Sequence, residues 1–393
     1  MSFFKASSLV RSFEESQTLL LSARAKKLAA EGRSIINFGG GELDFNTPSE
    51  IIDRAYEAAK KGQTKYTAVS GLPSLRKAIA RRISEDYGVG AHEEEILASC
   101  GGKQAIYHFL QAVVEPGDEV IILAPYWVSF PEMVKMVGGK PIIVRAKGER
   151  ITPEEVAAVV SDRTKVLILN SPSNPSGTVL TEDEIKGFME SIASKAAWIL
   201  SDDTYYRLVY APARFISPLQ IDSDWRKRVC VIGSSSKSYA MTGWRLGWAF
   251  GPKELILAMT KLQSQVTSSP ASPSQAAAEA ALLEFDGVAE DFRTRLIKRR
   301  DLMVKALKDI PKVSYLKPDG AFYVFANISG HFAGGSAGPS VTSFCSQLLE
   351  EHGVCVIPGV AFGDERFIRL SYSLSEEHIS EGIRRIRHAL LPK

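Results

Sequence analysis

The chain has 393 residues, of which 45% are hydrophobic and 24% charged, as in an ordinary globular protein. Its 48 basic and 45 acidic residues are interleaved and leave a net charge of +3, which argues against a nucleic-acid-binding face and favours a small-molecule ligand. The chain start lacks the apolar core of a secretory signal, and no window reaches the run of about 18 apolar residues that a membrane span needs, so we expect a cytoplasmic protein.

Short β-rich runs alternate with amphipathic segments through most of the chain. Candidate strands lie at 94–99, 118–124, 140–146, 164–170, 196–202, 228–234 and 245–251. Amphipathic segments such as 102–114 and 181–195 lie between several of them. Continuously apolar strands that alternate with helices predict an α/β fold with a mainly parallel sheet covered on both faces.

The pattern changes after about residue 285. A long charged helix at 289–310 precedes a strand, a turn and a strand at 313–328. A further helix, short strands in 353–359 and 366–372 and a final helix follow, which together predict a smaller α+β domain. The Gly- and Ser-rich segment 329–340 is predicted to be a mobile surface loop.

The candidate site lies in the loops after the strands, because a parallel sheet binds its ligands beyond the carboxyl ends of its strands. The run at 94–99 leads into Gly101 and Gly102 at the start of a helix, where free backbone amides suit a phosphate; a simple tight turn is the alternative. An ATP-binding loop does not fit, because Leu97 and Gln104 stand where that motif needs Gly and Ser or Thr.

Polar side chains end the next two strands. Asn170 ends one and is followed by Asn174, which a solvent-exposed turn would also explain. Asp202 ends the other and is followed by Tyr205. A carboxylate at a buried strand end needs a positive partner, which leaves an ion pair, a metal or a cationic cofactor. No histidine lies nearby, and the four cysteines have no metal-ligand spacing, so we expect free thiols and no metal.

Lys237 follows the run at 228–234, and Arg245 lies eight residues further on. Most lysines are solvated, but this one lies at the site end of a predicted strand. Trp127, after the run at 118–124, adds a flat aromatic surface. Pyridoxal 5′-phosphate matches this set, because its aldehyde condenses with a lysine, its phosphate binds amides and arginine, its ring nitrogen pairs with a carboxylate, and its ring stacks on an aromatic.

Several motifs, in their order and spacing, resemble those of the class I aminotransferases of fold type I. They are "GGGELDFNTP", "GGKQA", "PYWVSFPEM", "NSPSNPSG", "SDDTYY", "SSSKSYAMTGWRLG" and "FIRLSY". The resemblance runs nearly from end to end of the chain. It implies a large cofactor-binding domain at 46–285 with a seven-stranded, mainly parallel sheet, and a small domain from 1–45 and 286–393 that closes over the substrate.

The resemblance also implies a role for individual residues. Lys237 is the catalytic lysine that holds the cofactor and moves a proton at the substrate. Asp202 holds the ring nitrogen, Tyr205 and Asn174 bond the phenolic oxygen, and Trp127 stacks on the ring. The phosphate contacts that it implies are Gly102, Lys103, Ser234, Ser236, Arg245 and, from the partner subunit of a homodimer, Tyr66.

Arg369 resembles the arginine that binds the substrate α-carboxylate, with Gly41, Trp127 and Asn174 beside it. An exposed arginine paired with Glu365 is the alternative. Lys103 and Thr18 resemble residues that contact the distal carboxylate in the bacterial aspartate aminotransferase subgroup; for Lys103, phosphate neutralisation alone is the alternative.

The resemblance therefore implies exchange of an amino group between L-aspartate or L-glutamate and 2-oxoglutarate or oxaloacetate. Another amino-acid specificity (prephenate, aromatic or neutral), a lyase on the same fold and a non-catalytic sensor stay open. Two positions depart from the family pattern: Leu43 replaces a proline, and the family's "SDEIY" is "SDDTY", which includes Thr204. Leu43 is expected to loosen the turn that presents Gly41.

Overall fold

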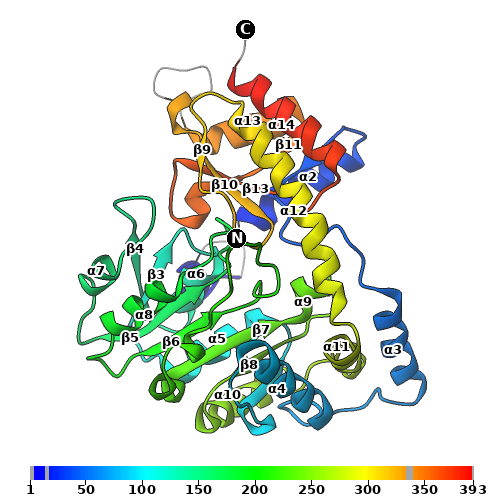
Figure 1. The fold of residues 1–393 in the computed structure, drawn as a ribbon, viewed down its shortest axis with the longest axis vertical. Helices are drawn as coiled ribbons and strands as arrows, with labels where there is room; N and C mark the ends of the chain where they lie inside the picture. The colour runs from blue at the N-terminus through cyan, green and yellow to red at the C-terminus, as the bar shows by residue number, and fades with distance from the viewer. Residues whose placement is uncertain (1–3, 14–16, 333–339, 392–393) are drawn as a thin grey trace.

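The chain is described by a computed structural model that covers residues 4–13, 17–332 and 340–391, without the side chains of residues 17–19. All seven expected strands are present and form one sheet, in the order β2-β8-β7-β6-β5-β3-β4 (Figure 1). Their bounds are β2 Ile96–Ser99, β3 Glu119–Ala124, β4 Lys140–Arg145, β5 Thr164–Asn170, β6 Trp198–Asp202, β7 Val229–Ser234 and β8 Gly247–Phe250. Only β8 runs antiparallel to its neighbours in this sheet, so the mainly parallel α/β sheet is confirmed.

Helices cover both faces of this sheet. One face packs against α3 Ser49–Lys60, α4 Pro73–Tyr87, α7 Pro153–Ala157, α8 Glu182–Ser191 and α11 Ser272–Glu284. The other face packs against α5 Gly102–Val113, α6 Ser129–Met136 and α10 Lys253–Val266. The two short helices α1 Ser8–Arg11 and α9 Ser235–Ser238 belong to neither of these two helical layers.

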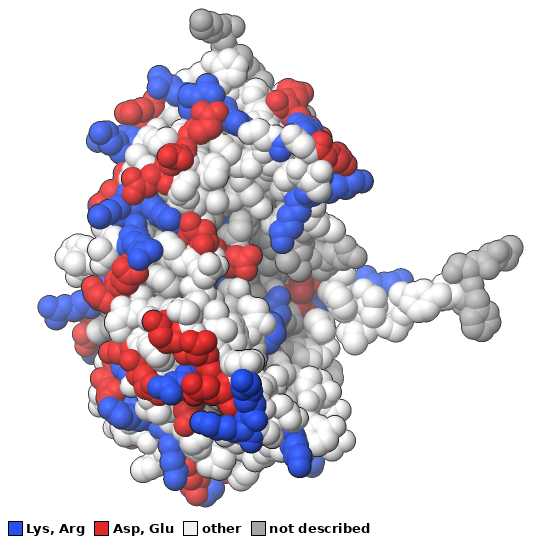
Figure 2. All heavy atoms as spheres, turned by 90° about the vertical axis from the view of Figure 1, so that its right-hand side faces the viewer, with Lys and Arg blue, Asp and Glu red and all other residues white. Residues whose placement is uncertain are grey.

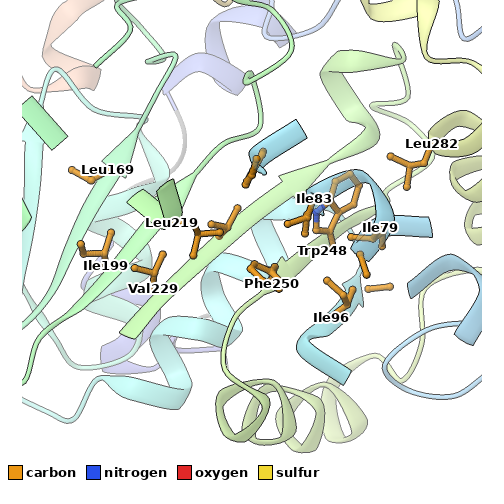
Figure 3. Close-up of a cluster of buried hydrophobic side chains, with 14 of the residues drawn as sticks. Ile79, Ile83, Ile96, Leu169, Ile199, Leu219, Val229, Trp248, Phe250 and Leu282 are labelled. Atoms are coloured by element: carbon orange, nitrogen blue, oxygen red, sulfur yellow. The ribbon is translucent and has the colours of Figure 1, made fainter. Parts of the chain in front are cut away.

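Alternate residues of each central strand face opposite layers. In β5, Leu167 and Leu169 join the cluster on one face, whereas Val166 and Ile168 join the cluster on the other. Figure 3 shows the first cluster, with Leu169 and Trp248 among its members. Because each fully buried aliphatic side chain contributes about 1.5–3 kcal/mol, both faces demand apolar residues. This explains why the strands are apolar throughout.

The C-terminal elements form a second layer system. They comprise α12 Gly287–Lys308, β9 Ser314–Tyr315, β10 Tyr323–Asn327, α13 Val341–His352, β11 Val354–Cys355, β12 Ile357–Pro358, β13 Phe367–Ser371 and α14 Glu376–Leu390. Four of these strands make a sheet in the order β12-β13-β10-β9, with antiparallel pairs throughout. Residues 333–339, in the segment predicted to be a mobile loop, lie outside the described residues.

The single strand expected in 353–359 is two short strands with different partners. β11 pairs in parallel with β1 Ile36–Asn37 from the chain start, and β12 pairs with β13. The chain therefore crosses from one small sheet to the other at Val356. Pro358, which has no amide hydrogen, ends the second pairing.

A third buried cluster joins the start of the chain to its end. It contains Ile36, Phe38 and Leu43 together with residues of α12, β10, β13 and α14. Figure 1 shows α2 Gln17–Ala30 beside these C-terminal elements. Tyr205 and Leu208, from the loop after β6, pack into the same cluster and tie it to the large sheet.

Three further observations concern the charged surface, the helices and the cysteines. Figure 2 shows basic and acidic side chains interspersed over one face of the molecule. Among the described helices, none is both long and apolar enough to cross a membrane. All four cysteines are free thiols, and three of them are buried.

Candidate active site

A cavity of about 450 Å³ lies where β5, β6 and β7 end, between the large sheet and the C-terminal sheet. Twelve of the fourteen site residues predicted from the sequence line it: Gly41, Gly102, Lys103, Trp127, Asn174, Asp202, Tyr205, Ser234, Ser236, Lys237, Arg245 and Arg369. The residues come from seven separate stretches of the chain. Their meeting follows from the sheet, because parallel strands deliver the loops at their carboxyl ends to one edge.

Two predicted site residues are not seen in this cavity. Tyr66 is 95% exposed and lines a different surface hollow, beside Leu72 and Leu283. Thr18 lies in α2, but its side chain is outside the described part of the structure. The roles of both residues stay predictions.

One end of the cavity is built to bind an anion. α5 begins at Gly102, and Gly101 before it has φ +83°, which favours glycine. A Cβ atom on Gly101 would lie 2.5 Å from Nη2 of Arg245, so the guanidinium lies directly over this turn. Ser236 contributes its amide and hydroxyl nearby, both bonded to the Ser234 hydroxyl at 3.1 and 2.8 Å. Helix-start amides, hydroxyls and a guanidinium together suit a phosphate.

Lys237 lies in α9, directly after β7, and reaches into the middle of the cavity. Its Nζ donates a hydrogen bond of 2.6 Å to the carbonyl oxygen of Gly41. Burial and, to a smaller extent, the charges of Arg245 and Arg369 lower the pKa of Lys237 to about 8, against the opposing effect of Glu42. The amine is therefore partly unprotonated near neutral pH, as a nucleophile or a base requires.

Asp202 lies at the buried end of β6 and is 6% exposed. Its Oδ1 accepts a hydrogen bond of 3.2 Å from the amide of Thr204. Burial raises the pKa of the Asp202 carboxyl, while hydrogen bonds from Thr204 and the charge of Lys237 oppose that rise. The described residues include no ion-pair partner for this carboxylate, so it is free to hold a cationic group of a ligand.

Arg369 lies in β13 and is only 2% exposed, so the alternative of a surface arginine paired with Glu365 is wrong. Its Nη1 donates to Oδ1 of Asn174 at 3.0 Å, and its Nη2 donates to the carbonyl oxygen of Gly39 at 2.8 Å. Its Nε is buried without a hydrogen-bond partner in the described structure. A buried guanidinium with a free donor suits a carboxylate ligand.

Lys103, the second residue of α5, lines the cavity together with Trp127. The Nζ of Lys103 lies 4.8 Å from the centre of the Trp127 ring system, within the range of a cation–π contact. Shielding from water and, secondly, the charge of Arg245 lower the pKa of Lys103. Two neighbouring cations that repel each other favour an anion beside them.

Sequence reasoning assigned no role to two residues that organise this site. Asn170 donates its Nδ2 to the carbonyl oxygen of Asp202 at 3.0 Å, and its Oδ1 accepts the amide of Asn174 at 3.0 Å. As a polar residue that ends an apolar strand, Asn170 carried a usable signal. Tyr323, whose hydroxyl lies 3.0 Å from that of Tyr205, carried none, because it is one aromatic residue among several in an apolar run.

The lowered pKa of Lys237 predicts its reactivity in the protein freed of small molecules. Only the unprotonated amine reacts with trinitrobenzenesulfonate, so we expect a half-maximal rate near pH 8 instead of the ordinary lysine value of 10.5. Mass spectrometry of the peptide that contains Lys237 measures this rate. In Glu42→Gln the midpoint should fall further, because the Glu42 carboxylate raises the pKa of Lys237. A wild-type midpoint near 10.5 would contradict the prediction.

Comparison with known proteins identifies the family of the chain. The family model of aminotransferase classes I and II matches residues 33–386. The aspartate/prephenate aminotransferase of Cereibacter sphaeroides is 43% identical over 380 residues, which cover 95% of each chain. The aspartate aminotransferase structure of Rhizobium meliloti has a TM-score of 0.93 at 38% identity, covering 98% of this chain and 99% of that one. That of Thermus thermophilus with maleate also has a TM-score of 0.93, at 34% identity, covering 98% and 100%. The chain belongs to the class I and II aminotransferase family.

Proposed function

We propose that the protein is a pyridoxal 5′-phosphate-dependent aspartate aminotransferase. It exchanges an amino group between L-aspartate or L-glutamate and 2-oxoglutarate or oxaloacetate in a ping-pong sequence. The observation that carries this proposal is the meeting of three groups in one cavity: the amine of Lys237, the unpaired carboxylate of Asp202 and the unpaired guanidinium of Arg369. The names of the relatives support the reaction and its acidic substrate.

The residues of the cavity fit the cofactor. The phosphate suits the amides at the start of α5, the hydroxyls of Ser234 and Ser236, and Arg245. Asp202 offers the buried carboxylate that a protonated pyridine nitrogen needs. When bound, the cofactor supplies an aldehyde that takes up the amino group and a ring that withdraws electrons from the substrate Cα.

Lys237 and Arg369 do complementary work on the substrate. Arg369 binds the α-carboxylate and so fixes the direction of the bond from Cα to hydrogen. Lys237, whose pKa is lowered to about 8, would remove that proton as a base. As an acid it would then return a proton to the aldehyde carbon of the cofactor. A base with a pKa close to the working pH can perform both transfers.

The remaining residues hold these two in place. With the cofactor bound, Asp202 would hold the ring nitrogen, and Tyr205 and Asn174 would hold the phenolic oxygen. Trp127 would support the flat face of the ring. Asn170 supports this arrangement, because its side chain bonds both the Asn174 amide and the Asp202 carbonyl oxygen.

Lys103 and Thr18 are proposed to read the distal carboxylate of the substrate. The ammonium of Lys103 lies at the cavity wall beside Trp127, which supports this role. Arg245, which lies close enough to lower the pKa of Lys103, supplies a positive charge for the phosphate. The charge of Lys103 is therefore available for the distal carboxylate. A distal carboxylate at Lys103 and an α-carboxylate at Arg369 select a dicarboxylic amino acid.

Absorbance of the purified protein loaded with pyridoxal 5′-phosphate tests the reaction. We expect the visible band to convert to the amine-form band on addition of aspartate or glutamate, and to return on addition of 2-oxoglutarate. Lys237→Ala should lower kcat at least about 10³-fold, because general acid–base and covalent steps both depend on this amine. Lys186→Ala, an exposed lysine on α8, is the control and should retain full activity.

Other results of the same titration would reject the proposal in distinct ways. Release of a 2-oxo acid and ammonia without an acceptor would indicate a lyase. A band that responds only to aromatic or neutral amino acids, or to prephenate as acceptor, would indicate another specificity. No cofactor band after reconstitution would indicate a non-catalytic protein.

The role of Lys103 is tested by Lys103→Met. Loss of a charged hydrogen bond of about 1.5–3 kcal/mol should lower kcat/KM for aspartate roughly 10- to 100-fold. The same variant with alanine as substrate is the internal control, since alanine has no distal carboxylate, and its kcat/KM should change little. Equal losses for both substrates, with weaker cofactor binding, would restrict Lys103 to the phosphate.

The assembly and the domain division remain proposals. A homodimer with shared sites is supported by Tyr66, which is 95% exposed and lies beside the exposed Leu283 on one surface hollow. A large domain at 46–285 and a small domain from 1–45 and 286–393 are supported by the separate buried clusters of the two sheets. A cytoplasmic location is tested by cell fractionation.

Crystal structures of the holoenzyme with and without maleate test assembly and closure together. We expect Tyr66 of one subunit near Arg245 of the other, and a rotation of the small domain that closes the cavity when the dicarboxylate binds. Identical interdomain angles in the two crystals would argue against closure. A monomer in the crystal and in sedimentation would argue against shared sites.

A further inference from the structure

Tyr323 is a fully buried residue that contacts the site from the C-terminal sheet. It begins β10, which pairs with β13 two residues away from Arg369, at Tyr323↔Ser371. Its side chain lines the cavity, and its hydroxyl lies 3.0 Å from the hydroxyl of Tyr205. No other hydrogen bond of either hydroxyl is seen within the described residues.

The ring of Tyr323 also supports the substrate-binding arginine. The Arg369 guanidinium carbon lies 4.6 Å from the ring centre, and the ring of Phe362 lies 5.0 Å from the same atom. These rings are electron-rich surfaces for a cation that has no carboxylate beside it. A Cβ atom on Gly41 would lie 3.7 Å from the Tyr323 hydroxyl, so the backbone that Lys237 bonds passes close by.

The direction of the Tyr323–Tyr205 hydrogen bond has a consequence for the ligand. Each phenol has one hydrogen, and burial raises the pKa of both groups, so both stay protonated. If Tyr205 donates to Tyr323, it has no hydrogen left for the cavity. If Tyr323 donates, the hydrogen of Tyr205 is free to bond an anionic oxygen in the cavity.

We propose that Tyr323 is a positioning residue with two separable functions: its hydroxyl donates to Tyr205 and so directs the Tyr205 hydrogen to the cofactor, and its ring holds the Arg369 guanidinium for the substrate carboxylate. This inference rests on the proposed function. It assigns to the C-terminal sheet an influence on the cofactor that acts through Tyr205, in addition to the role of Arg369 toward the substrate.

Two variants of the holoenzyme separate these functions. Tyr323→Phe removes the hydroxyl and keeps the ring. The Tyr205 hydroxyl then loses the donor that polarises and orients it, and so becomes a weaker donor itself. The visible absorbance of the bound cofactor therefore titrates with a higher midpoint, by up to roughly 0.4–1 pH unit, the shift for complete loss of a hydrogen bond of about 0.5–1.5 kcal/mol. The direction follows because a bond donated to the phenolic oxygen stabilises its anionic, proton-free state. We expect kcat to fall about 3- to 10-fold with KM nearly unchanged.

Tyr323→Leu removes the ring as well. A buried cation–π contact contributes about 2 kcal/mol, so we expect an additional rise of roughly 10- to 30-fold in KM for aspartate and in Kd for maleate. Tyr315→Phe is the matched control, because Tyr315 lies on the neighbouring strand and bonds the Val304 carbonyl oxygen, away from the cavity. It should change neither the absorbance midpoint nor KM.

The two proposals fail in different ways. If the protein binds the cofactor and turns over aspartate, but Tyr323→Phe matches wild type in midpoint and kcat, the positioning role of Tyr323 is overturned and the proposed function stands. If wild type forms no cofactor band, the proposed function fails first. Tyr323→Phe suffices for this decision should Tyr323→Leu not fold.

Discussion

Burying the guanidinium of Arg369 without a carboxylate beside it costs several kcal/mol unless polar groups or an anion replace the lost water. The chain supplies partial compensation: the Asn174 amide oxygen, the Gly39 carbonyl oxygen and two aromatic rings. The Nε stays unsatisfied. Two of these partners are themselves held by site residues, since Asn170 bonds the Asn174 amide and the Tyr205 hydroxyl contacts that of Tyr323. A free donor in a buried cavity lowers the stability of the unliganded protein. In the proposed function, the substrate carboxylate would accept a hydrogen bond from it.

An excess of positive charge is a property of the whole cavity, and not of Arg369 alone. Five basic side chains line it, against the two carboxylates of Glu42 and Asp202. Burial and, secondly, repulsion from the neighbouring arginines lower the pKa of Lys103 and of Lys237. One electrostatic arrangement thus serves two purposes, since it attracts an anionic cofactor and dicarboxylic substrates and leaves Lys237 able to lose its proton near neutral pH.

The large sheet could be predicted from the sequence, because seven apolar runs at regular spacing leave little choice of period. Five of them, which end at residues 99, 124, 170, 202 and 234, lead into residues that line the cavity. The depth of Arg369 could not, because a strand of five residues does not reveal which side chains a distant segment covers. The division of 353–359 between two sheets was missed for the same reason, since its first half pairs with residues near the chain start. Tyr323 was missed because its partner, Tyr205, is 118 residues away.

The site lies between two hydrophobic cores, so its geometry depends on the few residues that connect them. Lys237 and Asp202 belong to the large sheet, whereas Arg369 and Tyr323 belong to the C-terminal sheet. Tyr205 belongs to both in effect: it follows β6, yet it packs into the C-terminal cluster. A shift of one core against the other therefore changes the Tyr205–Tyr323 contact and the Arg369 contacts together. In the roles proposed for these residues, substrate binding and cofactor hydrogen bonding would be coupled through a single buried pair of phenols.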